Sequence, residues 1–385
     1  MRMHDGARGM DWNDAPRVCR GDVCDAQAFA RGVKWSPDGR KLLVACEGRT
    51  YRLYAWTKTD ESACWKPQRH VQEAGYTYDW KWRPKADGDE ATSECFASAS
   101  RGVPVHLWNA ENASLLGAYR VYDQHDELLA AHAVAFGADG SRLHCGCVSS
   151  VATFCVERPG RDYSVMRTDE AQAKEQGLRG IVSCLDVDRT YGDMLAVGSF
   201  HRRVAVYDLA SNQAVLLLEG HRCGVTQVQF SACGNFLYTA ARKEDRILCW
   251  DVRYTMKEVY QMDRSHNQTN QRIQFDIEPS GRRMAVGNTL GELILYDLRD
   301  GRKLSTQKMS CTTLNAVHYH PQEPLLAMST GCRPGFAQAG DESDTDSDSP
   351  RRDTDSQTKL SSPYMSVPSA VCVWASDFQH LDCNE

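Results

Sequence analysis

The sequence lacks the marks of several large protein classes. It contains no run of about 18 apolar residues, so no membrane-spanning helix is expected. Its N-terminus carries arginines but no apolar segment of the kind found in secretory signal peptides. No C-x-x-C pair occurs among the 16 cysteines, which argues against a zinc site, and a disulfide framework is not expected in so long a chain. These absences favour a soluble cytosolic or nuclear protein with reduced cysteines.

Catalytic signatures are missing as well. There is no G-x-S-x-G nucleophile elbow, and no glycine-rich phosphate loop follows a strand. His318 and His320 form an isolated H-x-H, a spacing that is usually structural when no further ligand stands nearby. We therefore expect no enzyme, no bound metal and no cofactor.

What the chain does contain is a repeat. Residues 224–251, GVTQVQFSACGNFLYTAARKEDRILCWD, alternate apolar and polar residues in three short runs that are separated by turns, which is the pattern of β-strands. The last large apolar residue of the first run and the aromatic residue of the closing run are 18 to 20 residues apart in five units: Trp35/Tyr54, Phe136/Phe154, Val187/Tyr207, Phe230/Trp250 and Ile277/Tyr296.

Two further units are longer. The pair Trp82/Trp108 is 26 residues apart, and Tyr319/Trp374 is 55 apart because an insert separates its strands. The pair His221 and Trp250-Asp251 matches the GH…WD signature of WD repeats. Seven such units predict an all-β protein, a seven-bladed WD-repeat β-propeller, in which each sheet buries its faces against its neighbours.

The expected domain boundaries follow from the repeats. Residues 1–28 form an N-terminal tail whose last part could add the closing strand to the final blade, 29–376 form the propeller, and 377–385 form a C-terminal tail. The insert, 331–367, is acidic and expected to be disordered; 341–356 alone carry a net charge of −5 out of −6 for the whole chain. Candidate phosphorylation sites there are Ser343, Thr345 and Ser349, which are followed by acidic residues or proline.

A candidate site comes from the turn before each closing strand. WD repeats usually carry an acidic residue six positions before the closing aromatic, where it ties the blade together. Here that position holds Gly48, Gly102, Val148, His201, Glu244 and Leu290, so only one is acidic. Arginines, lysine and histidine surround these turns, and all of them should emerge on one rim of the ring together with the connectors between blades.

A basic rim with interleaved aromatic and amide side chains suits single-stranded RNA, because cations neutralise phosphates and aromatic rings stack on unpaired bases. Trp80 and Trp82 are expected nearby. The alternative is that the charges are solvated, or that they pair with Asp123, Asp126 and Glu127. The RNA-binding candidates are Arg49, Arg101, Arg120, Tyr122, His125, Arg161, Arg202, Arg203, Arg242, Lys243, Asn270, Gln271 and Arg272.

Four stretches go beyond generic WD repeats. They are FARGVKWSPDG (29–39), SRGVPVHLWNAENASLLGAYRVYDQHDELLAAHAVAFGADGSRLHCG (100–146), RPGRDYSV (158–165), and ARKEDRILCWDVR with TNQRIQFDIEPSG (241–253 and 269–281). Together they resemble the telomerase Cajal body protein family. The motif positions that match the family include Arg101, Tyr122, His125, Arg161, Arg242, Lys243 and Asn270–Arg272, together with His106.

The resemblance implies a non-enzymatic RNA-binding scaffold. Members of the family recognise the CAB-box loop of H/ACA small Cajal-body RNAs and of vertebrate telomerase RNA. They associate with dyskerin-type H/ACA proteins and with telomerase, direct these particles to Cajal bodies in the nucleus, and are folded by the cytosolic chaperonin. We therefore expect a nuclear, Cajal-body protein that is also found in the cytoplasm, with roles in telomerase assembly and trafficking.

A rival hypothesis is a protein-only adaptor. WDVR (250–253) and YDLR (296–299) end neighbouring repeats and resemble the motif by which WD substrate receptors dock on a cullin ubiquitin-ligase adaptor. The motif is short, and an arginine in that position often packs on its own repeat.

Overall fold

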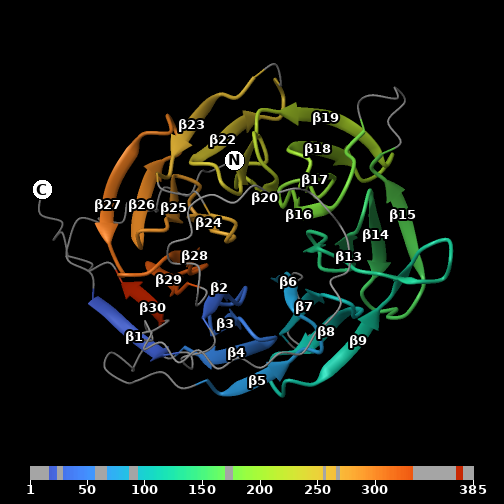
Figure 1. Ribbon diagram of the computed structural model, residues 1–385, viewed down its shortest axis with the longest axis horizontal. Coiled ribbons are helices and arrows are strands. Elements are labelled where there is room, and N and C mark those ends of the chain that lie inside the picture. Colours follow the sequence, from blue (N-terminus) through green and yellow to red (C-terminus); the bar gives the residue numbers. More distant parts are fainter. Residues whose placement is uncertain are drawn as a thin grey trace, which may run out of the picture.

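The computed structural model describes residues 17–23, 29–56, 67–85, 94–169, 177–254, 257–265, 269–332 and 370–375. Its strands form seven four-stranded antiparallel sheets, which ring a central opening as a seven-bladed β-propeller (Figure 1). No helix occurs among the described residues, and therefore no helix there that could cross a membrane. The expected all-β, seven-bladed fold is confirmed.

The strands follow one another from the inside of each blade to its outside, as strands a, b, c and d. Blade 1 contains β2 (Ala30–Trp35), β3 (Lys41–Cys46), β4 (Thr50–Ala55) and β5 (Arg69–Gln72); blade 2 contains β6 (Thr77–Trp82), β7 (Cys95–Ser100), β8 (Val105–Asn109) and β9 (Leu115–Tyr119). Blade 3 contains β12 (Ala133–Phe136), β13 (Arg142–Gly146), β14 (Ser150–Cys155) and β15 (Tyr163–Arg167); blade 4 contains β16 (Val182–Val187), β17 (Met194–Ser199), β18 (Arg203–Asp208) and β19 (Gln213–Glu219).

Blade 5 contains β20 (Val225–Phe230), β21 (Phe236–Ala241), β22 (Arg246–Asp251) and β23 (Tyr260–Asp263). Blade 6 contains β24 (Phe275–Ile277), β25 (Arg283–Gly287), β26 (Glu292–Asp297) and β27 (Lys303–Lys308). A small separate hairpin, β10 (Val121–Tyr122) and β11 (Leu128–Leu129), lies in the connector between blades 2 and 3.

Blade 7 joins the two ends of the chain. It contains β28 (Leu314–Tyr319), β29 (Leu325–Thr330) and β30 (Ala370–Ala375), and its outer strand is β1 (Arg17–Val23), which pairs antiparallel with β30. The sheet therefore closes the ring with a strand from the other end of the chain. Between β29 and β30 the chain leaves the described residues, so the acidic insert and Ser343, Thr345 and Ser349 lie outside them.

The strand register explains the repeat spacing. In blade 5, Phe230 stands opposite Leu237, and Leu237 stands opposite Trp250, so the two anchors lie on one rung of the sheet. The anchor pairs of the other six blades are joined in the same way through one residue of strand b. A fixed separation in sequence thus reports a fixed strand and turn length.

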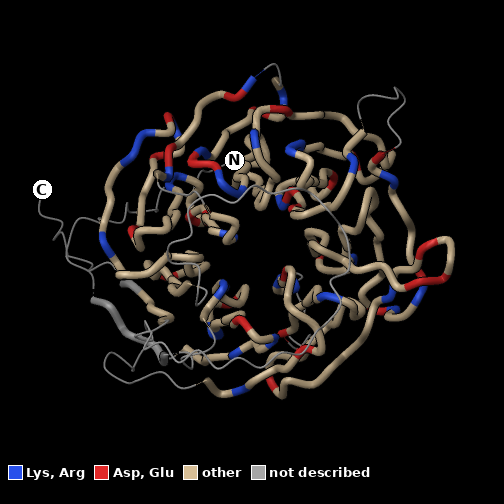
Figure 2. The backbone as a smooth tube through the Cα atoms, viewed as in Figure 1, with Lys and Arg blue, Asp and Glu red and all other residues tan. Residues whose placement is uncertain are grey.

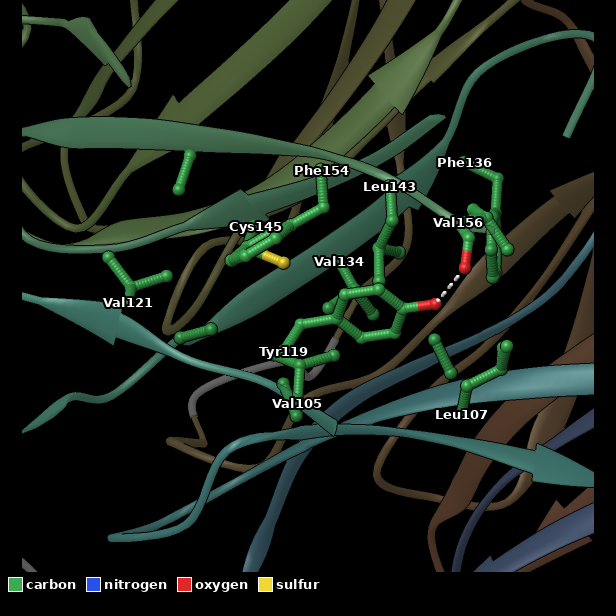
Figure 3. Packing of buried hydrophobic residues seen from close by; sticks show 14 of the residues in the cluster. Val105, Leu107, Tyr119, Val121, Val134, Phe136, Leu143, Cys145, Phe154 and Val156 are labelled. Carbon is green, nitrogen blue, oxygen red and sulfur yellow. Dashed lines mark hydrogen bonds between the residues drawn. The ribbon is translucent and has the colours of Figure 1, made fainter. Parts of the chain in front are cut away.

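The core lies between the blades. The cluster shared by blades 2 and 3 contains Val105, Leu107, Val134 and Phe154, and Tyr119 enters it with its hydroxyl donating to the carbonyl of Val156 at 2.6 Å (Figure 3). That hydrogen bond satisfies a phenol that would otherwise be buried without a partner. Each sheet is thereby covered on both faces, which a single blade could not achieve.

Three buried carboxylates link inner strands of successive blades. Asp79, Asp186 and Asp276 lie in the inner strands of blades 2, 4 and 6, and each accepts a backbone N–H from the following blade. The donors are Val134 at 3.1 Å, Phe230 at 2.9 Å and Tyr319 at 2.8 Å. A charged acceptor strengthens such a bond, so these contacts stabilise the order of the blades around the opening.

The ring has two distinct ends. Because neighbouring strands are antiparallel, the turns between strands b and c emerge at the same end as the connectors from strand d to the next blade. We call this end the b–c rim. The turns between strands a and b, and the loops between strands c and d, emerge at the opposite end, the a–b face.

Candidate nucleic-acid interface

The b–c turn of blade 5 is held by a buried hydrogen-bonded chain. Trp250 Nε1 donates to Thr239 Oγ1 at 2.9 Å, Thr239 Oγ1 contacts His221 Nε2 at 2.7 Å, and His221 Nδ1 lies 2.9 Å from Glu244 Oε2. All four residues are buried. Glu244, the one acidic residue found at this position in the sequence, therefore ties its turn to the blade.

Blade 2 uses a different carboxylate for the same purpose. Glu73, in the connector from blade 1, is 2% exposed and contacts His106 Nδ1 at 3.0 Å and Trp108 Nε1 at 3.2 Å. Trp108 also donates to Ser98 Oγ at 2.9 Å. Since this acid comes from the connector, the b–c turn of blade 2 needs none, and its Arg101 is exposed.

Basic side chains occupy the b–c turns of blades 1, 2, 4 and 5. Arg49, Arg101, Arg202 and Lys243 are all exposed on the b–c rim. Arg49, Arg202 and Lys243 have positive φ angles of 75°, 71° and 50°, which belong to tight turns. The strand order thus places the four cations at one end of the ring, on the turns of four different blades.

Two further candidates in blades 4 and 5 are engaged with neighbours. Arg203 is half-buried and pairs with Glu219 on the adjacent strand at 2.7 Å. The guanidinium of Arg242 lies 5.1 Å from the ring centre of Phe200, at the end of blade 4, so it joins the two turns. Both arginines remain partly exposed, but the charge of Arg203 is paired with that of Glu219.

A separate cluster lies at the perimeter. The hairpin of β10 and β11 projects beyond the outer strands of blades 2 and 3, as the teal loop at the right of Figure 1 and the acidic loop of Figure 2. Arg161 stacks on Tyr122 at 3.7 Å and pairs with Asp126 at 2.6 Å. The hydroxyl of Tyr163 accepts the N–H of Tyr122 at 3.0 Å.

These contacts decide how that cluster is interpreted. Arg161 lies in the loop between strands c and d of blade 3. Its pairing with Asp126, one of the three carboxylates proposed as alternative partners, supports that alternative for this residue. Arg120 and His125 are exposed beside it. The structure therefore divides the candidates: Arg120, Tyr122, His125 and Arg161 lie at the perimeter, whereas Arg49, Arg101, Arg202 and Lys243 lie on the b–c turns.

Two candidates in the connector between blades 5 and 6 contact other blades of the ring. Arg272 reaches across the central opening to Asp79, 3.3 Å away, and Gln271 donates to Asn315 and to the carbonyl of Gly331. Asn270 is exposed. Burial alone would raise the pKa of Asp79, but Arg272, Lys34 and Lys81 and the Val134 N–H lower it below its usual value.

The structure corrects one expectation and adds one residue. Trp80 and Trp82 are only 2% and 9% exposed, because they fill the core between blades 1 and 2, and neither can stack on RNA. Tyr76, which the sequence pattern did not single out, is 48% exposed on the b–c rim. Nothing in the sequence distinguishes it, since it follows a connector of no regular pattern.

No group of three or more His, Cys, Asp or Glu side chains in the described part of the chain is arranged to hold a metal. All cysteines whose side chains are described there are free thiols. In the described part of the chain, the b–c rim therefore offers exposed cations and amides and the exposed Tyr76 ring, beside exposed carboxylates such as Glu219 and Asp263.

Comparison with known proteins identifies the family. The WD domain, G-beta repeat model matches residues 212–251, which include most of blade 5. The telomerase Cajal body protein 1 of Mesocricetus auratus is 34% identical over 362 residues, and the human protein of that name is 33% identical over 360 residues; both alignments cover 88% of this chain. The chain belongs to the telomerase Cajal body protein family. The resemblance found in the sequence is confirmed.

The match has limits in length. The chain spans 66% of the hamster protein and 64% of the human one. A more distant relative is the guanine nucleotide-binding protein negative regulator 1 of Schizosaccharomyces pombe, 30% identical over 277 residues, which cover 67% of this chain and 68% of that protein.

Proposed function

We propose that this protein is a non-enzymatic scaffold that binds a single-stranded RNA loop at its b–c rim. The observation that carries the proposal is the exposure of Arg49, Arg101, Arg202 and Lys243 on the turns of four blades at one end of the ring. In an ordinary WD repeat an acidic residue occupies this region. In blades 1, 2 and 4 that position is not acidic, in blade 5 Glu244 is buried, and the neighbouring cations form a surface that attracts phosphate.

The RNA class follows from the family. Relatives at 33–34% identity are named for telomerase and the Cajal body. We infer that the ligand is the CAB-box loop of H/ACA small Cajal-body RNAs, with telomerase RNA as a further candidate. The proposed partners are dyskerin-type H/ACA proteins, telomerase and the chaperonin that folds the ring. The proposed location is the nucleus and its Cajal bodies, with a cytoplasmic fraction.

The proposed functional unit is the propeller, residues 29–376, closed by β1 from the N-terminal segment 1–28, with 377–385 as a C-terminal tail. Its mechanism is electrostatic capture followed by stacking. Arginine contacts to phosphates release counterions, so affinity should fall with salt, by a slope of about 0.7 per phosphate contacted on a single strand. An unpaired loop is preferred over a duplex because its bases can leave the stack and meet protein side chains.

The test is a gel-shift titration with a labelled H/ACA-type hairpin that carries a CAB-box loop. Arg101→Glu and Arg242→Glu should each weaken binding, by about tenfold or more, and should lower the salt slope. The matched control is Arg282→Glu, an exposed arginine in the a–b turn of blade 6 at the opposite end of the ring. Retained binding by both rim variants would reject the b–c rim as the RNA site.

A protein-only adaptor is the second candidate. Arg253 and Arg299 follow the c strands of blades 5 and 6 on the a–b face, and both are exposed. Each holds its own aspartate: Arg253 pairs with Asp251 at 2.8 Å, and Arg299 pairs with Asp297 at 2.5 Å. Their exposure on neighbouring blades is the observation that favours an adaptor. A pull-down with and without RNase separates the candidates, because an adaptor keeps its partners after RNA is destroyed.

A further inference from the structure

Tyr76 occupies the seam between two arginine-bearing turns. It lies in the connector from blade 1 to blade 2, and its side chain is 48% exposed. Phe200, the comparable ring beside Arg242, is half-buried. Among the described residues of the b–c rim, Tyr76 is therefore the aromatic ring that offers the largest free face.

One face of the Tyr76 ring already carries a cation. The guanidinium carbon of Arg49 lies 4.9 Å from the ring centre. Arg49 Nη1 also donates to the carbonyl of Ala74 at 2.9 Å, which fixes the guanidinium over the ring. A guanidinium in this position forms a cation–π contact with one face of the Tyr76 ring. The remaining exposed surface of the ring can contact a ligand.

The backbone of Tyr76 is fixed from both neighbouring blades. The N–H of Arg101 donates to the Tyr76 carbonyl at 2.8 Å, and Arg31 donates to the carbonyl of Thr77 at 2.5 Å. At Gly75 a Cβ atom would lie 2.0 Å from the carbonyl oxygen of Arg101, so only glycine allows this approach. The ring is thus held in place before any ligand arrives.

We propose that Tyr76 is the stacking platform for one unpaired nucleobase of the RNA loop, with Arg49 on the opposite face of the ring and Arg101 beside it at the adjoining phosphate. This deepens the proposed function and rests on it. Every base presents a π-face, so a tyrosine platform holds a nucleotide without choosing its identity. The site therefore requires a base at one loop position but tolerates any base there.

The first test changes the RNA and leaves the protein intact. Single abasic sites are placed in turn through the loop of the labelled hairpin, and binding is measured by titration. One position should lose roughly 5- to 150-fold in affinity when abasic, the range expected for one stacking contact, and should tolerate substitution by each of the four bases. If that position also discriminates among the bases, the platform proposal is wrong.

The second test changes the ring. Tyr76→Phe keeps the ring and should bind within about twofold of the parent, whereas Tyr76→Leu keeps the apolar bulk and should lose the same 5- to 150-fold. The abasic site should no longer weaken binding to Tyr76→Leu. The salt slope of Tyr76→Leu should match the parent, whereas Arg101→Gln should lower it by about 0.7. A merely structural effect of Tyr76 would not cancel the abasic penalty.

The possible failures are distinguishable. If Arg101→Glu and Arg242→Glu bind like the parent, the proposed function fails and the platform fails with it. If they weaken binding but Tyr76→Leu does not, the rim stands and the platform is overturned. Equal losses in Tyr76→Phe and Tyr76→Leu assign the effect to the hydroxyl and overturn stacking. Unchanged RNA affinity with loss of a protein partner assigns Tyr76 to a protein interface instead.

Discussion

Replacing His221 with alanine should destabilise the ring by about 3 kcal/mol, without any effect on the exposed cations. His221 is the middle of the buried chain in blade 5. Its Nδ1 faces Glu244 Oε2 at 2.9 Å and its Nε2 faces Thr239 Oγ1 at 2.7 Å. Because Thr239 already accepts from Trp250, its hydroxyl hydrogen is free to point at His221. Both ring nitrogens of His221 therefore have a buried hydrogen-bond partner, with Nδ1 donating to the carboxylate.

The magnitude follows from these contacts. Losing a hydrogen bond to a charged acceptor costs about 1.5–3 kcal/mol, and losing a neutral one costs about 0.5–1.5 kcal/mol. Glu244 keeps a partner in Arg246, whose Nε lies 3.1 Å away, and Thr239 keeps Trp250. Because these partners remain, we expect a total near the middle of the summed range of about 2–4.5 kcal/mol.

Urea unfolding, followed by tryptophan fluorescence, measures the change. With a slope of about 3 kcal/mol per M, a loss of about 3 kcal/mol lowers the midpoint by about 1 M. His201→Ala is the matched control, because His201 occupies the position of Glu244 in blade 4 and is exposed. It should change the free energy of unfolding by less than about 0.5 kcal/mol.

A double-mutant cycle with Thr239→Val gives the stricter test. The two residues share one hydrogen bond, so their effects should be non-additive by about 0.5–3 kcal/mol. A coupling near zero, or a His221→Ala cost no larger than that of His201→Ala, would refute the reasoning.

The pH dependence of unfolding supplies a second check. Burial alone would raise the pKa of Glu244, but His221 and Arg246 lower it below 4.5, so its stabilisation should be present above pH 4.5 and lost at lower pH.

Three other changes test the frame of the ring. Gly75→Ala should cost about 1–3 kcal/mol, because its Cβ would lie 2.0 Å from the Arg101 carbonyl; a melting temperature equal to the parent's would contradict the close approach. Burial lowers the pKa of Lys34 to about 7, so the folded state loses a proton near pH 7 that the unfolded state keeps to about pH 10.5, and stability should rise with pH across that window. Lys34→Met should remove that rise in urea titrations at pH 7 and 10; an unchanged pH dependence would count against it. Deleting residues 1–23 removes β1 and bares the edge of β30. Size-exclusion chromatography should then show self-association, whereas a stable monomer would argue against β1 as the closing strand.

The number and size of the blades could be predicted because the anchor residues of each repeat recur at a nearly fixed separation in the sequence. Strand and turn lengths fix which residues share a rung, and Phe230 and Trp250 are joined through Leu237 as a direct result. The role of Glu244 was also visible, because its partner His221 and the closing Trp250 stand at regular distances along the chain. Both predictions depend on contacts within one repeat.

The features that could not be predicted, namely the burial of single residues and the ion pairs between blades, depend on contacts between repeats. Trp80 lies in a strand like other strands, and only the packing of blade 1 against blade 2 shows that it is buried. Arg264 was one of several arginines in connectors, yet it is 1% exposed and donates to the backbone carbonyls of Ala241 and Glu244. Arg272 pairs with Asp79 of a blade 193 residues away. A pattern within one repeat cannot predict contacts between residues so far apart in the sequence.

The two kinds of contact together explain how the b–c turns of blades 2 and 5 are supported while each carries an exposed cation. In blade 5 the acid of the b–c turn is consumed by the buried chain, so Glu244 contributes stability and no surface charge. In blade 2 the carboxylate that contacts His106 and Trp108 is Glu73 of the connector, so the b–c turn itself needs no acidic residue. Arg101 can then stand exposed on the turn without any loss of support to the blade. In blade 2 the stabilising carboxylate therefore lies outside the turn, and the turn carries an exposed positive charge at Arg101.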